Sequence, residues 1–268
     1  MSYRPLTSIP APEAVEDPTT AAILRRGFLV VGVSDDTQLL GARNPITGQL
    51  EGFDIDVARA LAQAMFGDPE RISYRVISAS DRAPLLDTGG IDVVARNMTM
   101  TCARWEQVNF SIEYLAAEQK VLVRTSPGAD PPSQSLGDLS GHRVCAPVGT
   151  SSYQRLTRFA GVIPVGADSH TACLVLFQQG KVDAITGDEP VLAGLVAQDP
   201  YAAITTAGSI ADEPYALGLA HGETYFTQYV NRALLDWEAD GGWQDSYDRW
   251  LEPSLGRATA PRPRYGEP

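Results

Sequence analysis

A stretch of ten residues, 95–104, combines the groups that bind a small anion. It leaves an apolar run that we expect to be a strand, and it leads into residues 103–108, which we expect to form a helix. The hydroxyl and amide of Thr99 and the guanidinium of Arg104 suit a carboxylate, because the planar donors of arginine match two oxygens at once. Ligands of α/β proteins bind beyond the carboxyl ends of the strands, where this stretch lies. The alternative is a surface arginine paired with Glu106 or with solvent.

Two more arginines could serve the same site. Arg82 follows a strand expected at residues 72–77, and Arg96 stands directly beside Asn97. Both guanidinium groups could face the cleft that contains Thr99, and together they would make it positive. Each could equally be a solvated surface group, and the residues alone leave both possibilities open.

A second set of polar residues comes later in the chain. The turn 149–152 precedes an expected helix, so the amides and hydroxyls of Thr150 and Ser151 would point outward from a positive helix end, which suits an anion. A plain N-cap is the alternative. Asp188 stands just past an expected strand, where its carboxylate could bind an ammonium group or could cap the helix that begins at Glu189. Two anion-binding sets and one acidic group match a zwitterion better than a phosphate.

Motifs of common catalytic sites are missing from the sequence. It contains no G-x-S-x-G, no G-x-x-x-x-G-K-[ST], no G-x-G-x-x-G after the first strand and no H-E-x-x-H. The histidines His142, His170 and His221 lie at the edges of segments, and we expect them to be ordinary surface residues. The pattern favours binding over catalysis, and an acid/base pair outside these motifs remains open.

The elements that position these residues follow a β-α-β-α-β order, which is typical of a mostly parallel sheet covered by helices. Phe53, Val57, Leu61 and Met65 recur every four residues and predict an amphipathic helix that ends at Gly67. The expected elements of this series are a strand at 28–33, a hairpin-like loop at 44–48, this helix, a strand at 72–77, a short helix capped by Ser80 or Asp81 and ending at Leu86, and a strand at 91–95.

A second series repeats this plan. Residues 85–94 and 176–185 share Leu, Gly, Asp and β-branched residues at the same offsets, with a helix ending at the glycine and a strand starting two residues later, which indicates two similar lobes. Chance similarity is the alternative. The series comprises strands at 142–146, 162–165 and 182–186 and helices at 151–159, 170–179 and 189–197. We expect a strand at 215–220 and the last helices, through 251, to return to the first lobe, with chain crossings near 117–120 and near 214.

Composition limits the classes to which this chain can belong. Its 268 residues, 44% hydrophobic and 20% charged, are ordinary for a globular protein, and a net charge of −12 argues against nucleic-acid binding, which needs clustered Lys and Arg. No apolar run reaches the roughly 18 residues of a transmembrane helix. The start of the chain lacks the pattern of a signal peptide. Cys102, Cys145 and Cys173 allow one disulfide with one thiol left over, and they show no zinc spacing, so we expect no structural zinc. We also expect no other metal and no cofactor.

Four motifs, in order over residues 22–252, carry a family resemblance. They are Gly-Phe-Asp-Ile-Asp at 52–56, Thr-x-Thr-x-x-Arg at 99–104 followed by Val-Asn-Phe-Ser at 108–111, Gly-Thr-Ser-Ser at 149–152, and Val-Asp-Ala-Ile-x-x-Asp at 182–188. Together they resemble the polar amino-acid-binding proteins of ABC importers, family 3 of the solute-binding proteins, and most closely the actinobacterial glutamate/glutamine-binding lipoproteins.

This resemblance implies an α/β fold of the periplasmic-binding-protein type II, with two lobes that close on a ligand about a two-stranded hinge. Lobe 1 would comprise residues 22–117 and 216–253, and lobe 2 residues 118–215. A flexible N-terminal tail, 1–21, and a C-terminal tail, 254–268, would lie outside them.

The resemblance also implies a role for the polar residues that would hold the ligand's backbone groups. Thr99 and Arg104 would hold the α-carboxylate, together with Thr150 and Ser151 from the other lobe. Asp188 would hold the α-ammonium group.

The resemblance assigns specificity to two arginines, and the sequence departs from the family pattern in one place. Arg82 would hold a side-chain carboxylate, with Arg96 as its helper, and Asn97 would offer backbone contacts. Members of the family usually present an aromatic platform after the first strand, but loop 37–42 has none. The first-lobe wall of the site is therefore expected to differ.

The function implied is capture of a free amino acid for an ABC permease or a membrane sensor, without catalysis. Glutamate and aspartate are favoured, followed by glutamine and asparagine. A cyclohexadienyl-type dehydratase on the same fold is the alternative, and it would need an extra acid such as Glu51 or Glu113.

Relatives that resemble this chain often carry cysteines at the positions of Cys145 and Cys173, which implies a disulfide between them. Cys102 would then be free or paired to a group outside this chain. A bond between Cys145 and Cys173 implies an oxidising, extracytoplasmic compartment. The resemblance further implies a cell-surface lipoprotein whose removed signal does not appear in this sequence. We expect a monomer that contacts the membrane only through a lipid anchor.

Overall fold

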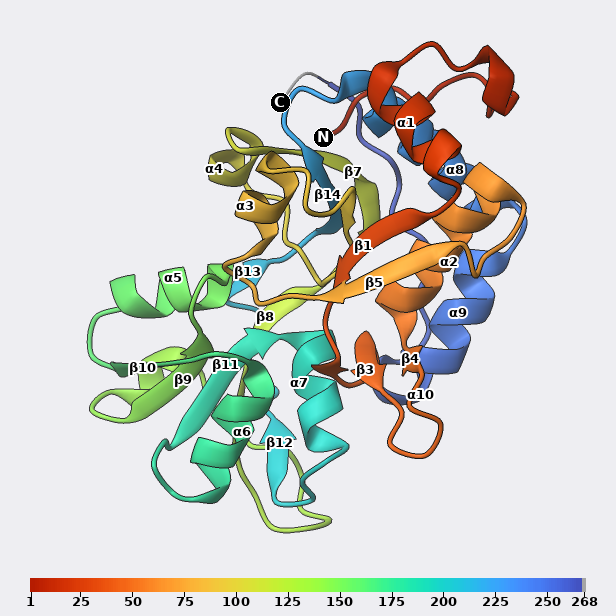
Figure 1. Ribbon diagram of the computed structural model, residues 1–268. Helices are drawn as coiled ribbons and strands as arrows, with labels where there is room; N and C mark the ends of the chain where they lie inside the picture. Colours follow the sequence, from red (N-terminus) through yellow and green to blue (C-terminus); the bar gives the residue numbers. More distant parts are fainter. Residues whose placement is uncertain (267–268) are drawn as a thin grey trace.

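The computed structural model describes residues 1–266 and divides them into two lobes, each built on its own β-sheet (Figure 1). Lobe 1 carries a five-stranded sheet at the upper right of Figure 1, and lobe 2 carries a six-stranded sheet at the lower left. The expected two-lobed α/β architecture is confirmed. The strands of lobe 1 are β1 (Leu29–Val33), β5 (Ile72–Val76), β6 (Val93–Val94), β7 (Val108–Leu115) and β14 (Tyr215–Ala220), with a small sheet of β2 (Asp36–Thr37), β3 (Gly41–Arg43) and β4 (Leu50–Glu51).

The first sheet has the order β5-β1-β6-β14-β7. Strand β1 is parallel to β5 and β6, and β14 returns antiparallel between β6 and β7. The continuous apolar run of β1 explains its interior position, because a strand covered on both faces needs apolar side chains on both. The helices that cover this sheet are α1 (Pro18–Arg26), α2 (Phe53–Phe66), α3 (Arg82–Asp87), α4 (Cys102–Trp105), α8 (Thr224–Ala239), α9 (Gly242–Trp250) and α10 (Glu252–Leu255), and a 3-10 turn spans Pro12–Ala14.

The second sheet has the order β10-β9-β11-β8-β12, and a short strand, β13, also pairs with β8. Strand β9 is parallel to both of its neighbours, whereas β8 is antiparallel to both of its own. The strands are β8 (Glu118–Arg124), β9 (Arg143–Pro147), β10 (Ile163–Ala167), β11 (Ala184–Asp188), β12 (Ala202–Ile204) and β13 (Ala211–Asp212), and the helices are α5 (Ser151–Arg158), α6 (His170–Gln178) and α7 (Glu189–Val196), with a 3-10 turn at Leu136–Leu139.

Helix α2 follows the predicted periodicity. Phe53, Val57, Leu61 and Met65 are all buried against the first sheet and its neighbouring helices. The helix ends at Gly67, whose φ of 69° lies in the left-handed region that glycine adopts without strain.

The internal repeat has a structural counterpart in both lobes. Asp92 accepts a hydrogen bond from the backbone N–H of Val30 at 2.7 Å, and Asp183 accepts one from the N–H of Arg143 at 2.8 Å. Each aspartate thus ties the start of one parallel strand to its neighbour. The helix preceding each aspartate ends two residues before the shared glycine, and not at it as expected.

The chain passes between the two sheets twice. Residues 116–117 connect β7 to β8, and residues 213–214 connect β13 to β14. The N–H of Glu213 donates to the carbonyl of Ala117 at 2.8 Å, so the two crossing segments are joined to each other. We call them the crossing segments below.

Three differences between the predicted and the observed elements lie close to the predicted site residues of lobe 1. The helix expected at 103–108 covers only Cys102–Trp105, because Val108 is the first residue of β7. The strand expected at 91–95 is reduced to two residues, since the neighbouring strands pair with it only there. Asp81 does not cap α3 with its side chain, which instead accepts hydrogen bonds from the backbone and hydroxyl of Ser78.

The N-terminal segment packs against lobe 1 through specific contacts. Ser2 is fully buried, and its hydroxyl donates to the carbonyl of Phe110 at 2.8 Å and accepts from the amide of Asn231 at 2.9 Å. Its backbone forms a bridge with Tyr265. The segment expected to be a tail, 1–21, contains the 3-10 turn at Pro12–Ala14, and its end is helical because α1 begins at Pro18.

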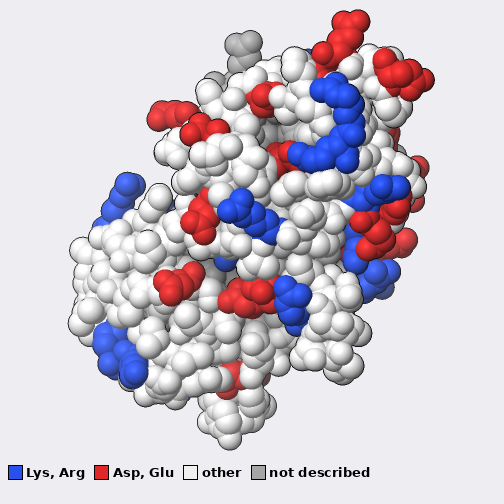
Figure 2. All heavy atoms as spheres, viewed as in Figure 1, with Lys and Arg blue, Asp and Glu red and all other residues white. Residues whose placement is uncertain are grey.

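Charged side chains of both signs are interspersed on the face shown in Figure 2, and they are denser over lobe 1 than over lobe 2. Positive charges on this face do not merge into one continuous patch. None of the helices within residues 1–266 has the length and apolar character needed to cross a membrane.

The expected disulfide joins Cys145 in β9 to Cys173 in α6, and both residues are fully buried in lobe 2. Replacing both by serine is expected to lower the free energy of unfolding by about 3–4 kcal/mol, because the bond closes a loop of 28 residues in the unfolded chain. Urea denaturation followed by circular dichroism measures the change. Cys102→Ser, at an exposed free thiol, is the matched control and should leave the midpoint unchanged. Equal stability of the double variant and the wild type would contradict the prediction.

Candidate functional site

The predicted site residues gather where the two lobes meet, and all of them except Arg104 are buried. Those of lobe 1 begin α3, follow β6 or lie in α4, and those of lobe 2 begin α5 or end β11. They are Arg82, Arg96, Asn97, Thr99 and Arg104 from lobe 1 and Thr150, Ser151 and Asp188 from lobe 2. Within residues 1–266, no cluster of His, Cys, Asp and Glu is arranged to hold a metal ion.

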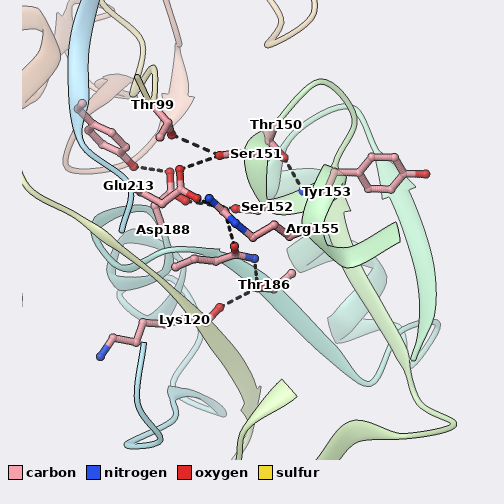
Figure 3. A network of polar contacts seen from close by, with 12 residues as sticks. Thr99, Lys120, Thr150, Ser151, Ser152, Tyr153, Arg155, Thr186, Asp188 and Glu213 are labelled. Atoms are coloured by element: carbon pink, nitrogen blue, oxygen red, sulfur yellow. Dashed lines mark hydrogen bonds and ion pairs between the residues drawn. The ribbon is translucent and has the colours of Figure 1, made fainter. Parts of the chain in front are cut away.

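Asp188 is the last residue of β11 and is 5% exposed. Its carboxylate accepts a hydrogen bond from the hydroxyl of Tyr215 at 2.7 Å. It also accepts one from the hydroxyl of Ser152 at 3.2 Å (Figure 3). It does not cap α7 with its side chain, so the structure contradicts the capping alternative. Burial, and then the neighbouring carboxylate of Glu213, raise the pKa of Asp188 to about 7. A cationic group of a ligand beside Asp188 would therefore stabilise its ionised carboxylate.

Arg104 contacts both lobes. Its Nη1 donates to the carbonyl of Thr99 at 2.7 Å, and its Nη2 donates to the carbonyl of Gly149 at 3.2 Å. The alternative of an ion pair between Arg104 and Glu106 is not observed among the described residues. Burial lowers the pKa of Arg104, but the carboxylates of Glu213 and Asp188 act in the opposite sense. The guanidinium has five N–H donors, so donors remain for a carboxylate beside the two carbonyls.

The two hydroxyls at the start of α5 have different partners. The hydroxyl of Thr150 accepts from the N–H of Tyr153 at 3.1 Å and donates to the carbonyl of Pro147 at 2.7 Å, so it is an N-cap and its proton is used within lobe 2. The hydroxyl of Ser151 lies 3.3 Å from that of Thr99, across the contact between the lobes (Figure 3).

Sequence reasoning missed Glu213, although it lies beside the crossing predicted near residue 214. Its carboxylate is fully buried, accepts from the hydroxyl of Ser151 at 2.7 Å and pairs with Arg155 of α5 (Figure 3). Arg155 also donates to Gln119 at 2.8 Å, and Gln119 donates to Thr186 at 2.9 Å. This network connects α5, β8 and β11 to a crossing segment.

Arg82 and Arg96 are buried, contrary to the alternative of solvated surface groups. Arg82 is 3% exposed, and its Nη2 donates to the carbonyl of Arg96 at 2.8 Å. Burial, and then the positive charges of Arg96 and Arg104, lower the pKa of Arg82 from its usual range. The Nε atoms of Arg82 and Arg96 are buried without a hydrogen-bond partner in the described part of the chain. Two guanidinium groups thus have unused donors beside each other.

Asn97 has an unusual backbone that Asp54 supports. Its φ is 36°, and its N–H donates to Asp54 at 2.7 Å, so only its carbonyl and side chain remain for a ligand. The other oxygen of Asp54 accepts from the hydroxyl of Tyr114 at 2.7 Å. Burial raises the pKa of Asp54 to about 6, whereas the charges of Arg82 and Arg96 oppose this rise. Asp54 belongs to the Gly-Phe-Asp-Ile-Asp motif, and that motif was the signal for it in the sequence.

His170 was expected to be an ordinary surface residue, and the structure contradicts this. Its Nε2 is buried without a partner in the described part of the chain. Burial, and then the positive charge of Arg96, lower the pKa of His170 to about 4, so the imidazole is neutral at pH 7. The ring fills space that a side chain at Gly187 would need, because a Cβ there would lie 2.4 Å from Nε2. His170 brings a neutral polar group of lobe 2 towards the arginines of lobe 1.

The loop after β1 lacks the aromatic platform that is usual in the family. It contacts lobe 2 through its backbone. The carbonyl of Asp36 accepts from the hydroxyl of Thr171 at 2.9 Å. The carbonyl of Gln38 faces Gly194 of α7 so closely that a Cβ at that position would lie 2.6 Å from it. The lobes therefore meet on this side through main-chain contacts.

Comparisons with known proteins agree with this geometry. Residues 29–253 match the model of the bacterial extracellular solute-binding proteins, family 3. The chain is 31% identical to the glutamine-binding protein of an ABC transporter from Bacillus subtilis (strain 168), over 87% of this chain and 85% of that protein. It is 29% identical to a glutamate-binding protein of Corynebacterium efficiens, over 88% of this chain and 81% of that protein.

A solved structure gives the same fold. An ancestral amino-acid-binding protein, described as a precursor of cyclohexadienyl dehydratase, is 28% identical to this chain, with a TM-score of 0.77 over 87% of this chain and 99% of that one. The names of the two relatives above describe a glutamine-binding protein of an ABC transporter and a glutamate-binding protein. Together with the match over residues 29–253, these likenesses show that the chain belongs to the family 3 bacterial extracellular solute-binding proteins.

Proposed function

We propose that this protein captures an acidic amino acid, glutamate or aspartate, in preference to glutamine or asparagine, and presents it to an ABC permease or a membrane sensor. The observation that carries this preference is Arg82. Its guanidinium is buried, two other arginines lie near it, and it forms no ion pair with a carboxylate of residues 1–266. A buried charge without a partner is costly, and an anionic ligand would remove that cost.

The surrounding groups suit the rest of an amino acid. Asp188 would hold the α-ammonium group, and free donors of Arg104 with the amides near Thr99 and Ser151 would hold the α-carboxylate. The distal carboxylate would then lie by Arg82 and Arg96, with the neutral ring of His170 on the opposite lobe. This assignment is supported by the unused donors of both arginines.

The dehydratase alternative receives less support. Glu51 accepts a hydrogen bond from Asn44 at 3.0 Å within the β3–β4 hairpin. Glu113 lines a separate cavity of about 440 Å³ beside the crossing segments, together with Glu118 and Arg264. Neither acid therefore lies among the residues that gather between the lobes.

Titration calorimetry against glutamate, aspartate, glutamine, asparagine and arginine tests the proposal. We expect a dissociation constant of about 1 µM or tighter for an acidic amino acid and at least tenfold weaker binding of its amide. Stronger binding of the amides would overturn the acidic preference. If none of the five binds and a cyclohexadienyl acid is consumed, the binding function itself is wrong.

Glutamate affinity is expected to depend on pH through Asp188. Because burial and Glu213 raise the pKa of this carboxyl to about 7, it holds a proton below that pH in the unliganded protein. An ammonium group binds the ionised form, so affinity should rise up to tenfold per unit from pH 5.5 to about 7 and then level off. The side-chain carboxyl of glutamate titrates near 4.3, below this range. Calorimetry at several pH values measures the slope.

The stability of the unliganded protein should change in the opposite direction. A carboxyl whose pKa is raised by folding binds more protons when folded, so its contribution to stability falls as the pH rises from about 4 to about 7. Asp188→Asn serves as the control, because asparagine does not titrate. It should remove the contribution of residue 188 to the pH dependence of glutamate affinity and of stability. A flat affinity profile in the wild type would contradict the assignment of Asp188.

We propose an extracytoplasmic location, which the family description and the buried Cys145–Cys173 disulfide support. Anchoring by an N-terminal lipid and a monomeric state remain predictions. Metabolic labelling with a fatty acid and light scattering of the purified protein test them.

A further inference from the structure

Glu213 occupies a position from which it can link the crossing segments to the ligand site. It lies between β13 and β14, and its N–H donates to the carbonyl of Ala117 in the other crossing segment at 2.8 Å. Its side chain is fully buried. A buried carboxylate is retained only where its oxygens have partners, so the two groups that bind it define what it does.

The two carboxylate oxygens have different partners on the same helix. One pairs with the guanidinium of Arg155, whose side chain is 36% exposed, and the other accepts from the hydroxyl of Ser151 at 2.7 Å. Arg155 and Ser151 lie one helical turn apart on α5, so the carboxylate spans the first turn of this helix. Glu213 thus connects the crossing segments to the start of α5.

The hydrogen bond from Ser151 to Glu213 determines which hydroxyl is the donor in the contact between Ser151 and Thr99. A serine hydroxyl has a single proton, and a carboxylate paired with arginine can only accept, so Ser151 donates to Glu213. The hydroxyl of Ser151 then has only lone pairs for Thr99, 3.3 Å away in lobe 1. Thr99 must therefore be the donor in that contact.

We propose that Glu213 is a positioning residue for ligand capture, which acts through Ser151. By taking the only proton of Ser151, it orders a chain of hydrogen bonds from Thr99 in lobe 1, through Ser151 in lobe 2, to the crossing segments. The chain forms only when the lobes meet, so it favours the closed arrangement around the ligand. The inference rests on the proposed capture of an amino acid between the lobes.

Glu213→Gln is the first test, because an amide of the same size cannot accept at both of its heteroatoms. Its amino group must face either Arg155 or Ser151, and one of the two bonds is lost or reversed. We expect glutamate to bind at least tenfold more weakly. Ser151→Ala should have a similar effect, and the double variant should bind no more weakly than the worse single variant.

A purely structural role for Glu213 gives a different result. If Glu213 only stabilised α5 through Arg155, the loss of affinity caused by Glu213→Gln would persist at full size in the Ser151→Ala background, and the two effects would add. That outcome would overturn the inference. Thr157→Ala is the matched control, because it removes a hydroxyl from α5 that bonds only the carbonyl of Gln154 on the exposed side. Its affinity should equal that of the wild type.

Two further variants keep the inference testable if Glu213→Gln does not fold. Glu213→Asp keeps the charge for Arg155 but withdraws the carboxylate from Ser151, and it should also weaken binding in a Ser151-dependent manner. Ser151→Thr retains the hydroxyl and should restore the affinity that Ser151→Ala loses. If the wild type and Thr157→Ala bind glutamate normally, additive effects refute only the role of Glu213. If the wild type binds no amino acid, both proposals fall.

Discussion

Replacing Arg104 by methionine is expected to weaken binding of every amino acid by at least 100-fold. Its guanidinium is the proposed partner of the α-carboxylate, which all amino acids share, and it also joins the carbonyls of Thr99 and Gly149 across the lobes. Removing one partner of a largely buried charge pair costs about 3–5 kcal/mol, which corresponds to a factor of roughly 100 or more in affinity. Titration calorimetry with glutamate and glutamine measures both losses.

Arg104→Lys and Arg158→Met complete this experiment. Lysine keeps the charge but not the planar pair of donors, so its loss should be intermediate. Arg158 is an exposed arginine of α5, and its replacement by methionine should leave affinity unchanged. If Arg104→Met weakened glutamate binding but not glutamine binding, Arg104 would bind the side-chain carboxylate, and the orientation of the ligand would have to be reversed.

Replacing Arg82 by methionine is expected to change selectivity. Glutamate should bind about 100-fold more weakly, because its distal carboxylate would be buried without its cation, whereas glutamine, which has no distal charge, should lose much less. The preference for the acid over the amide would then disappear or reverse. Calorimetry with both ligands gives the ratio of affinities, and an equal loss for both would refute the assignment of Arg82 to the side-chain carboxylate.

The same variant should stabilise the unliganded protein. Arg82 is 3% exposed and lies near the positive charges of Arg96 and Arg104. Replacing a buried charge by an apolar side chain of similar length removes that cost, and a gain of about 1–3 kcal/mol is expected. Thermal unfolding without ligand measures it. A variant with weaker glutamate binding and a higher melting temperature would show that Arg82 is retained for the ligand and not for the fold.

The local elements could largely be predicted because their signals are local. The spacing of Phe53, Val57, Leu61 and Met65 and the glycine after them define α2 within fifteen residues of sequence. The prediction of a helix over 103–108 was wrong because of a distant strand pairing. The sequence around Trp105 is compatible with a helix, but the pairing of Val108 with Ala220 on β14 draws it into a strand. Pairing with a strand about 110 residues away is not visible in local propensity.

The candidate site could be predicted only in part. Thr99, Arg104 and Asp188 could be predicted as site residues from their side chains and their places after expected strands. Glu213 and His170 gave no such local signal. Glu213 is 62 residues from Ser151, and its role exists only because the chain crosses between the lobes beside α5. His170 looked like an exposed helix start, and burial against β11 and near Arg96 made it a neutral group of the site.

The order of strands and helices and the chemical groups available at their ends can be deduced without the structure, because periodicity, glycine positions and side-chain types are properties of short segments. Which of these groups are free to bind a ligand depends on how the chain folds. In the folded chain, the hydroxyl of Thr150 caps a helix, that of Ser151 donates to Glu213, and Arg82 is buried with no carboxylate of residues 1–266 as an ion-pair partner. The physical reason is that burial and hydrogen-bond partners are set by residues distant in the chain, and they fix the charge, pKa and unused donors of each side chain.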